Sequence, residues 1–219
     1  MSEGIARLGA LLQQVDAHPL PTGTSRPLTE GLATLGLGWA LYSEQLWPAL
    51  TLALSAAVNG HNGAGLLTLA DGASERGPQG YRGDLEEALY AVNCLDRPDR
   101  TQFSAVPGSV PEFERASPTF GRSFAYTQAS CSSWPAEGHG RPHPLHAVGA
   151  APIVVVSTTR DPATPYAWRV ALARELRSGV LVTRVGDGHG GFVAGNRCVD
   201  RAVEGYLVGG HVPEDGLRC

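Results

Sequence analysis

The last third of the chain alternates between short apolar runs and amphipathic stretches. Residues 153–159 form a β-branched apolar run, which is typical of a strand buried on both faces. Residues 164–177 open on Thr-Pro, an N-cap and first-turn proline, and predict a helix. A second apolar run at residues 180–185 predicts the next strand. The order strand–helix–strand predicts an α/β fold with a parallel sheet over residues 150–219.

A final helix is predicted after the second strand. Asn196 is its expected N-cap, and Gly209-Gly210 is its expected stop. Its apolar face would be formed by Val199, Ala202, Val203, Tyr206 and Leu207. Two or three strands do not complete a doubly wound sheet. We therefore expect either further strands from elsewhere or an open sheet edge.

The first 135 residues have helical periodicity and no convincing buried strand. Residues 32–59 are strongly apolar, but their longest uninterrupted stretch, residues 50–58, is far below the roughly 20 residues that cross a bilayer. Two packed helices broken near Trp47-Pro48 are expected there. The other predicted helices cover residues 4–16, 66–73, 84–93 and 120–130, while residues 19–27 and 103–117 are expected to be loops.

Two polar residues follow the two predicted strands of the last third. Asp161 comes just after the first strand, and His189 lies in the glycine-rich loop of residues 186–191 after the second. Loops that leave adjacent parallel strands meet at one sheet edge, so we expect the two side chains to lie within hydrogen-bond reach. A carboxylate that orients an imidazole is the acid–base part of a Ser…Asp…His triad, in the chain order of the α/β-hydrolases.

A nucleophile to complete such a triad is not found. The G-x-S-x-G elbow places its serine on a turn between a strand and a helix. Ser25 follows no strand and precedes a proline that blocks a helix, while Ser74 and Ser123 lack both the strand and the second glycine. We predict that none of the three is a nucleophile.

The four cysteines, Cys94, Cys131, Cys198 and Cys219, are an even number without a C-x-x-C pair. This pattern favours disulfides over a zinc site. Sequence proximity favours Cys94–Cys131 and Cys198–Cys219, although three pairings are possible and four buried thiols are the alternative.

His139, His143 and His146 lie in a proline-rich segment that gives their rings no common helical face. A solvated surface loop is favoured there over a zinc site, so no metal and no cofactor are predicted. The formal net charge of −4, without a Lys/Arg cluster, argues against a nucleic-acid partner.

Several motifs together resemble a known family. Residues 161–166 (DPATPY), Gly188-His189-Gly190 and the closing segment from Cys198 to Cys219 look like the C-terminal domain of the secreted tripeptidyl-aminopeptidase-like α/β-hydrolases of actinobacteria. The resemblance is specific over residues 150–219. It is looser upstream, where residues 91–96 and 131–135 are similar to the helical cap of that family.

The resemblance implies a partial α/β-hydrolase fold, with a mainly helical cap or lid in residues 1–149 and the C-terminal α/β segment in residues 150–219. Asp161 would be the triad acid and His189 the triad base. The pairs Cys94–Cys131 and Cys198–Cys219 would match the family's disulfides.

The expected function is the cap and C-terminal portion of a serine exopeptidase that releases short peptides from N-termini. The complete enzyme would bind a peptide substrate, whereas the isolated chain should be inactive without the elbow. The alternatives are an esterase or lipase-type hydrolase, and a non-catalytic truncated scaffold or binding protein. The uncovered sheet edge could support self-association.

The resemblance and the cysteines imply a secreted or cell-envelope protein. Residues 1–16 lack the basic start and continuous apolar run of a signal peptide. An export signal is therefore expected on sequence upstream of this chain.

Overall fold

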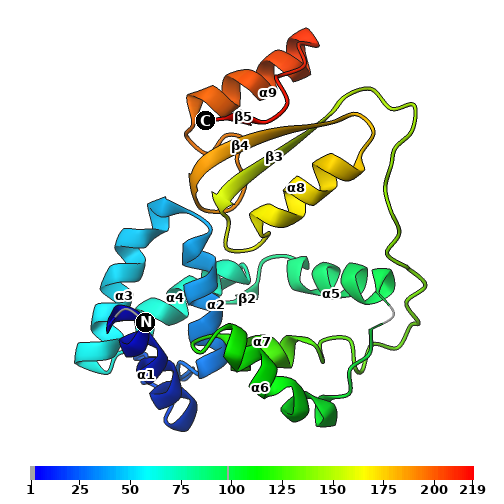
Figure 1. The fold of residues 1–219 in the computed structure, drawn as a ribbon. Helices are drawn as coiled ribbons and strands as arrows, with labels where there is room; N and C mark the ends of the chain where they lie inside the picture. Colours follow the sequence, from blue (N-terminus) through cyan, green and yellow to red (C-terminus); the bar gives the residue numbers. More distant parts are fainter. Residues whose placement is uncertain (1–2, 98) are drawn as a thin grey trace. The chain divides into compact units, whose positions relative to one another are not determined.

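The computed structural model describes residues 3–97 and 99–219, which divide into two compact units (Figure 1). One unit, here called the helical unit, contains the chain up to Trp39 together with Pro48–Pro142. The other, the sheet unit, contains Ala40–Trp47 and His143–Cys219. A short segment from the first third of the sequence thus belongs to the unit built by the last third.

The helical elements before residue 130 are α1 (Glu3–Ala17), α2 (Glu30–Leu41), η1 (Glu44–Leu46), α3 (Trp47–Gly60), α4 (Ala64–Ala73), α5 (Leu85–Asp96), η2 (Phe103–Ala105), α6 (Val106–Ala116) and α7 (Gly121–Thr127). Strands β1 (Arg76–Gly77) and β2 (Gly80–Tyr81) form a two-residue antiparallel pair. Helices α2 and α4 pack closely at Gly36, where a Cβ would lie 2.5 Å from the carbonyl oxygen of Leu66. The mainly helical character predicted for this region is confirmed.

The apolar stretch forms the two predicted helices, and the break between them lies directly before Trp47. The chain leaves α2 at Leu41, and Pro48 is the second residue of α3 rather than part of the break. Proline fits the first turn of a helix because the N–H that it lacks would have no partner there. Among the described residues, no helix is both long and apolar enough to cross a membrane.

The prediction of a loop over residues 103–117 is wrong. Helix α6 forms there although Pro111 lies inside it. Its buried Val106 and Val110 pack with Ala125 and Ala129 of the α7 region in one apolar cluster. Burial of this face offsets the hydrogen bond that the internal proline cannot donate.

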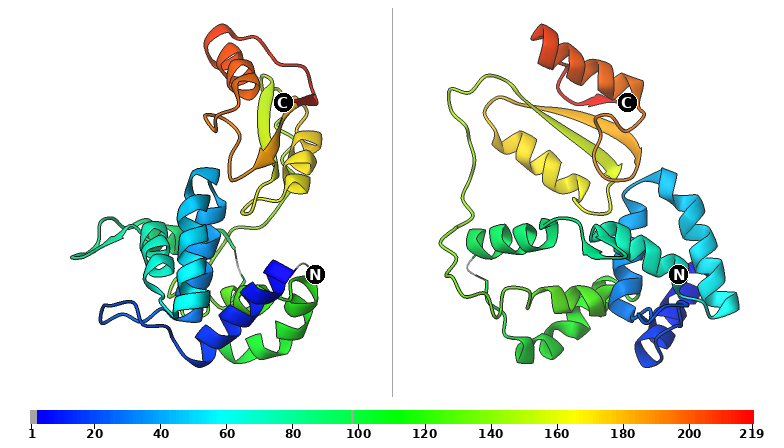
Figure 2. Two further views of the ribbon diagram at one scale, coloured as in Figure 1. Left: turned by 90° about the vertical axis from the view of Figure 1, so that its left-hand side faces the viewer. Right: turned by 180° about the vertical axis from the view of Figure 1, so that it is seen from behind.

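The sheet unit contains β3 (Ile153–Arg160), α8 (Tyr166–Glu175), β4 (Gly179–Asp187), α9 (Arg197–Gly209) and β5 (Leu217–Arg218). The strands form a parallel sheet in the order β3-β4-β5, which confirms the predicted α/β fold. Figure 2 shows α8 and α9 on opposite faces of this sheet. The two-residue β5 was not predicted.

Side chains of the strands alternate between the two helices. Val182 of β4 packs with Val199 and Val203 of α9. Its neighbour Thr183 points to the other face, where its hydroxyl is 2.9 Å from that of Tyr166 on α8. A sheet covered on both faces holds its strand ends, and the loops that leave them, in fixed positions.

Each unit contains one disulfide, and both are the predicted pairs. Cys94 is bonded to Cys131 in the helical unit, with Cα atoms 5.4 Å apart. Cys198 at the start of α9 is bonded to Cys219, with Cα atoms 5.6 Å apart. The second bond ties the last residue and β5 to α9.

Candidate active site

The candidate site lies at the carboxyl end of the parallel sheet. Asp161 is the first residue after β3, and His189 is two residues beyond β4. Arg160 and Asp187, at the ends of these strands, are register partners. Because β3 and β4 are neighbours and parallel, their loops leave the same edge. This topology brings together two residues that are 28 positions apart.

Asp161 and His189 form a hydrogen-bonded pair. The Nδ1 atom of His189 is 3.0 Å from Oδ1 and 3.0 Å from Oδ2 of Asp161. The Asp161 side chain is only 4% exposed, whereas that of His189 is 36% exposed. The carboxylate is thus enclosed, and the imidazole reaches the surface.

The Asp161 carboxylate accepts several further hydrogen bonds. The backbone N–H groups of Ala163 and Thr164 donate to Oδ1 at 2.8 and 2.9 Å, and the Thr164 hydroxyl donates to Oδ2 at 2.9 Å. Burial raises the pKa of Asp161, but the bonds from Thr164, His189 and Ala163 outweigh it and lower this pKa to about 2. Asp161 is therefore an ionised acceptor at neutral pH.

The charge of Asp161 decides which nitrogen of the neutral imidazole carries the proton. An ionised carboxylate only accepts hydrogen bonds, so Nδ1 of His189 must carry the proton that they share. In the neutral imidazole, Nε2 is then the acceptor. This tautomer is the one in which a histidine can take a proton from a hydroxyl group.

The glycines of the histidine loop are required by its backbone. Gly188 and Gly190 have φ values of +96° and +79°, in the region that side chains disfavour. A Cβ at Gly191 would lie 2.6 Å from Cγ1 of Val156, so the loop runs directly against β3. The Thr158 hydroxyl donates to the carbonyl of Gly190 at 2.6 Å and fixes the loop to the strand.

A second ion pair lies beside the candidate site. The Arg160 guanidinium donates from Nε and Nη2 to the two carboxylate oxygens of Asp187, each at 2.7 Å. This contact lowers the pKa of Asp187. Since both side chains are partly exposed, the pair adds little stability but joins the ends of the two strands.

Two residues around Asp161 were not identified as site residues from the sequence. Thr164 was predicted as the N-cap of the following helix, but α8 begins after Pro165, and the Thr164 hydroxyl bonds to Asp161 instead. Arg169 on α8 donates to that hydroxyl from Nη2 at 3.0 Å. The Asp-Pro-x-Thr spacing is typical of an Asx turn and could have indicated Thr164. No sequence signal indicated Arg169.

The three serines considered as nucleophiles do not lie on a strand-to-helix elbow. Ser25 is in the turn between Leu20 and Leu28, which form a β-bridge. Ser74 is the C-cap of α4. Ser123 lies inside α7, and its hydroxyl donates to the carboxylate of Glu30.

The loop histidines have individual backbone contacts. The N–H of His139 donates to the carbonyl of Leu95 at 3.2 Å, and the Nδ1 atom of His146 is 3.2 Å from the carbonyl oxygen of Glu175. Among residues 3–97 and 99–219, no group of three or more His, Cys, Asp or Glu residues has a geometry that could hold a metal ion.

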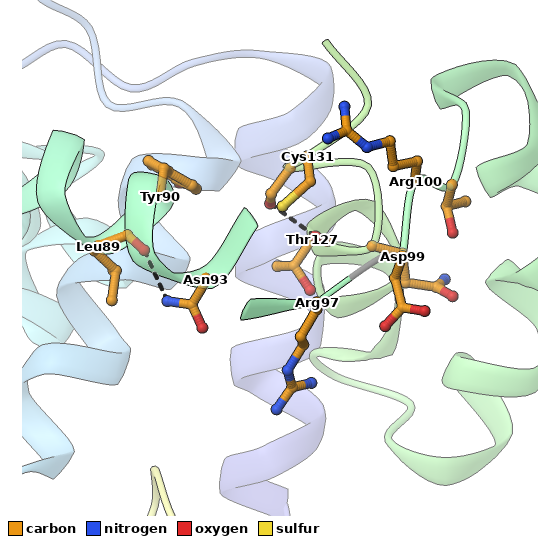
Figure 3. Close-up of a pocket in the computed structure, with 11 residues that line it drawn as sticks. Leu89, Tyr90, Asn93, Arg97, Asp99, Arg100, Thr127 and Cys131 are labelled. Atoms are coloured by element: carbon orange, nitrogen blue, oxygen red, sulfur yellow. Dashed lines mark hydrogen bonds between the residues drawn. The ribbon is translucent and has the colours of Figure 1, made fainter. Parts of the chain in front are cut away.

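The helical unit contains a cavity of about 570 Å³ (Figure 3). Its lining combines polar and apolar surface and consists of Leu89, Tyr90, Asn93, Arg97, Asp99, Arg100, Thr101, Thr127, Gln128, Ser130 and Cys131. In Figure 3, the side chains of Arg97 and Arg100 extend in opposite directions. Arg100 donates to the carbonyl oxygens of Trp134 and Ala136, which holds the loop that follows Cys131.

Comparison with known proteins relates the chain to hydrolases. Residues 117–219 match the model of a family described as "TAP-like protein". Carboxylesterase B of Mycobacterium tuberculosis is 35% identical over 100% of this chain, which covers 42% of that protein. Serine protease Hip1 of the same organism is 37% identical over 93% of the chain and 39% of its own length. Tripeptidyl aminopeptidase of Streptomyces lividans is 27% identical over 60% of the chain and 25% of its own length. The chain thus spans about two fifths of the length of the first two relatives.

Proposed function

We propose that this chain carries the acid and the base of a serine-hydrolase triad, because residues 117–219 match the TAP-like family of α/β-hydrolases. His189 is the base that takes the serine proton through Nε2 and returns it to the leaving group. Asp161 holds the imidazole in the required tautomer and stabilises its cation. The observation that carries this proposal is the bond from Nδ1 of His189 to an ionised, enclosed Asp161.

The nucleophile in this proposal is a serine on a polypeptide segment other than these 219 residues. A serine hydrolase also needs backbone N–H donors that stabilise the oxyanion, and these lie next to the nucleophile elbow. The positions of Ser25, Ser74 and Ser123 in turns and helices support this part of the proposal.

The substrate class that we favour is a peptide, from whose N-terminus a short peptide is released. Two similar proteins are named serine protease Hip1 and tripeptidyl aminopeptidase. The cavity of the helical unit is lined in part by Asn93, Thr127 and Gln128, whose polar side chains suit the amide groups of a peptide. In this proposal, the helical unit acts as the lid that shapes substrate access.

Ester hydrolysis is the second candidate function. The relative named carboxylesterase B is similar over 100% of this chain, whereas the tripeptidyl aminopeptidase is similar over 60% of it. A triad of the same geometry serves both reactions, so peptide and ester substrates have to be compared directly. We place either enzyme outside the cell or in the cell envelope, a location with which two disulfides are compatible.

Labelling with a fluorophosphonate probe, which reacts with activated serines, tests the location of the nucleophile. The purified 219-residue chain should remain unlabelled under conditions that label a known serine hydrolase to completion. Stoichiometric labelling of Ser25, Ser74, Ser123 or another serine of this chain would contradict the proposal.

A further inference from the structure

We propose that Tyr42 is a positioning residue for His189, and that its backbone carbonyl and its aromatic ring together hold the imidazole in place. Tyr42 directly follows α2, in the segment Ala40–Trp47 that belongs to the sheet unit. This inference rests on the proposed role of His189 as the base of a triad.

Two separate contacts join Tyr42 to the histidine. The backbone N–H of His189 donates to the carbonyl oxygen of Tyr42 at 2.9 Å. The ring centroids of Tyr42 and His189 are 4.8 Å apart, with an angle of 53° between the ring planes. This separation and tilt are favourable for aromatic pairs. The backbone contact fixes the Cα of His189, and the ring contact restricts its side-chain torsions.

Gly188, the residue before His189, also lies close to the carbonyl oxygen of Tyr42. Gly188 has a φ of +96°, and a Cβ at this position would lie 2.8 Å from the carbonyl oxygen of Tyr42. The absence of a side chain therefore lets the histidine loop approach Tyr42 closely. Both this close contact and the positive φ value explain why position 188 is a glycine.

The ring contact matters because the imidazole is at the surface. The His189 side chain is 36% exposed, and Tyr42 is 37% exposed. Asp161 binds a single atom of the imidazole, Nδ1, and leaves the ring able to turn toward water. A tyrosine ring packed against the imidazole limits this rotation and thereby keeps the Nδ1 proton on the Asp161 carboxylate. Tyr42 thus complements Asp161, which holds the other side of the same histidine.

Nuclear magnetic resonance on the 219-residue chain tests this role without a nucleophile. The measured quantities are the exchange rate of the His189 Nδ1 proton with water and the contacts of the imidazole protons. Tyr42→Ala removes the ring and keeps the carbonyl, Tyr42→Leu keeps apolar bulk without an aromatic ring, and Tyr42→Phe keeps the ring. Tyr81→Ala, at an exposed tyrosine of β2, is the matched control.

We expect the proton exchange rate to rise roughly two- to tenfold in Tyr42→Ala and Tyr42→Leu, the range that corresponds to an aromatic pair contact. Tyr42→Phe and Tyr81→Ala should match the unsubstituted chain. The inference would be overturned if Tyr42→Ala or Tyr42→Leu folds and shows the same Nδ1 proton exchange rate and the same imidazole orientation as the unsubstituted chain. So would a Phe variant that behaves like the Ala variant, because the hydroxyl would then be the important group.

The same spectra separate this inference from the proposed function. A His189 Nδ1 proton that is protected but insensitive to the Tyr42 ring would refute the role of Tyr42 alone. A histidine that does not carry its proton on Nδ1 in the unsubstituted chain would refute the acid–base pair and, with it, the positioning role.

Discussion

The Nδ1 atom of His189 is 3.0 Å from each carboxylate oxygen of Asp161, although the two residues belong to loops after different strands. The carboxylate is enclosed and accepts three further hydrogen bonds from Ala163 and Thr164. The imidazole therefore has Nδ1 engaged with Asp161, and in the proposed function Nε2 is the atom that acts as the base.

The first prediction concerns acid stability. The pKa of Asp161 is about 2 in the folded chain, against an ordinary value of 3.8. The carboxylate therefore stabilises the fold fully above about pH 4, and this contribution is lost as the pH falls through about 2. The unsubstituted chain should have a higher free energy of unfolding than Asp161→Asn, and this difference should become smaller by about 2 kcal/mol as the pH falls through this range. Urea unfolding of both proteins at about pH 5 and pH 2 measures it, and a pH-independent difference would contradict the prediction.

The second prediction concerns Thr164, whose hydroxyl donates to Asp161 and accepts from Arg169. Thr164→Val keeps the shape of the side chain and removes both bonds. The pKa of Asp161 should rise, and the free energy of unfolding at neutral pH should fall by about 1.5–3 kcal/mol, as for hydrogen bonds to charged groups. Carboxyl-carbon resonance titration and urea unfolding measure the two effects.

Thr68→Val is the matched control, because the Thr68 hydroxyl is exposed and donates to the neutral carbonyl of Ala64 at 3.0 Å. It should cost less stability and leave the pKa of Asp161 unchanged. An equal loss of stability in both variants would mean that the Thr164 hydroxyl has no special relation to the carboxylate.

The parts of the molecule that could be predicted from sequence are those with strong local patterns. The apolar runs of β3 and β4, separated by a predicted helix, indicated two parallel strands of one sheet, and this arrangement implied that Asp161 and His189 would meet. The resemblance to tripeptidyl-aminopeptidase-like hydrolases is confirmed by the family match of residues 117–219.

The parts that could not be predicted depend on contacts between distant segments. Helix α6 was missed because Pro111 is locally unfavourable inside a helix, whereas the packing of Val106 and Val110 that stabilises α6 appears only in the folded chain. The contact of Tyr42 with the histidine loop has no periodicity that a sequence could reveal. Strand β5 is two residues long and too short for an alternating pattern.

The third prediction concerns the disulfide between Cys198 and Cys219. The Val185 N–H on β4 donates to the carbonyl of Cys219 at 2.7 Å. The disulfide therefore helps to hold the last residue of the chain against β4. The double variant Cys198→Ser/Cys219→Ser should lose about 3–4 kcal/mol of stability, because the unfolded chain regains conformational freedom. Urea unfolding gives the loss of stability, and hydrogen exchange reports on the Val185 amide.

Cys94→Ser/Cys131→Ser is the control, since it opens a disulfide of the helical unit. It should also reduce stability but leave the Val185 amide protected. Loss of Val185 protection in both double variants would show that the Cys198–Cys219 bond has no local effect on β4.

The fourth prediction concerns the free edge of β3, which pairs only with β4 in the described part of the chain. Unpaired strand edges promote association between chains. Light scattering after size exclusion should show a mass that rises with protein concentration, and the outward N–H groups of β3 should gain protection from exchange. A mass that stays at 23.0 kDa at all concentrations would contradict self-association through this edge.

The most direct test of the central claim is fluorophosphonate labelling of a chimera. The part of Mycobacterium tuberculosis carboxylesterase B that this chain does not cover would be fused to the 219 residues, and its labelling compared with that of three variants. We expect the chimera to be labelled, His189→Ala to be unlabelled, Asp161→Asn to react about 10⁴-fold more slowly, and the control His211→Ala to match the chimera. Labelling of the His189→Ala chimera at the full rate, or a folded chimera that is never labelled, would contradict the claim that Asp161 and His189 are the acid and base of a serine hydrolase.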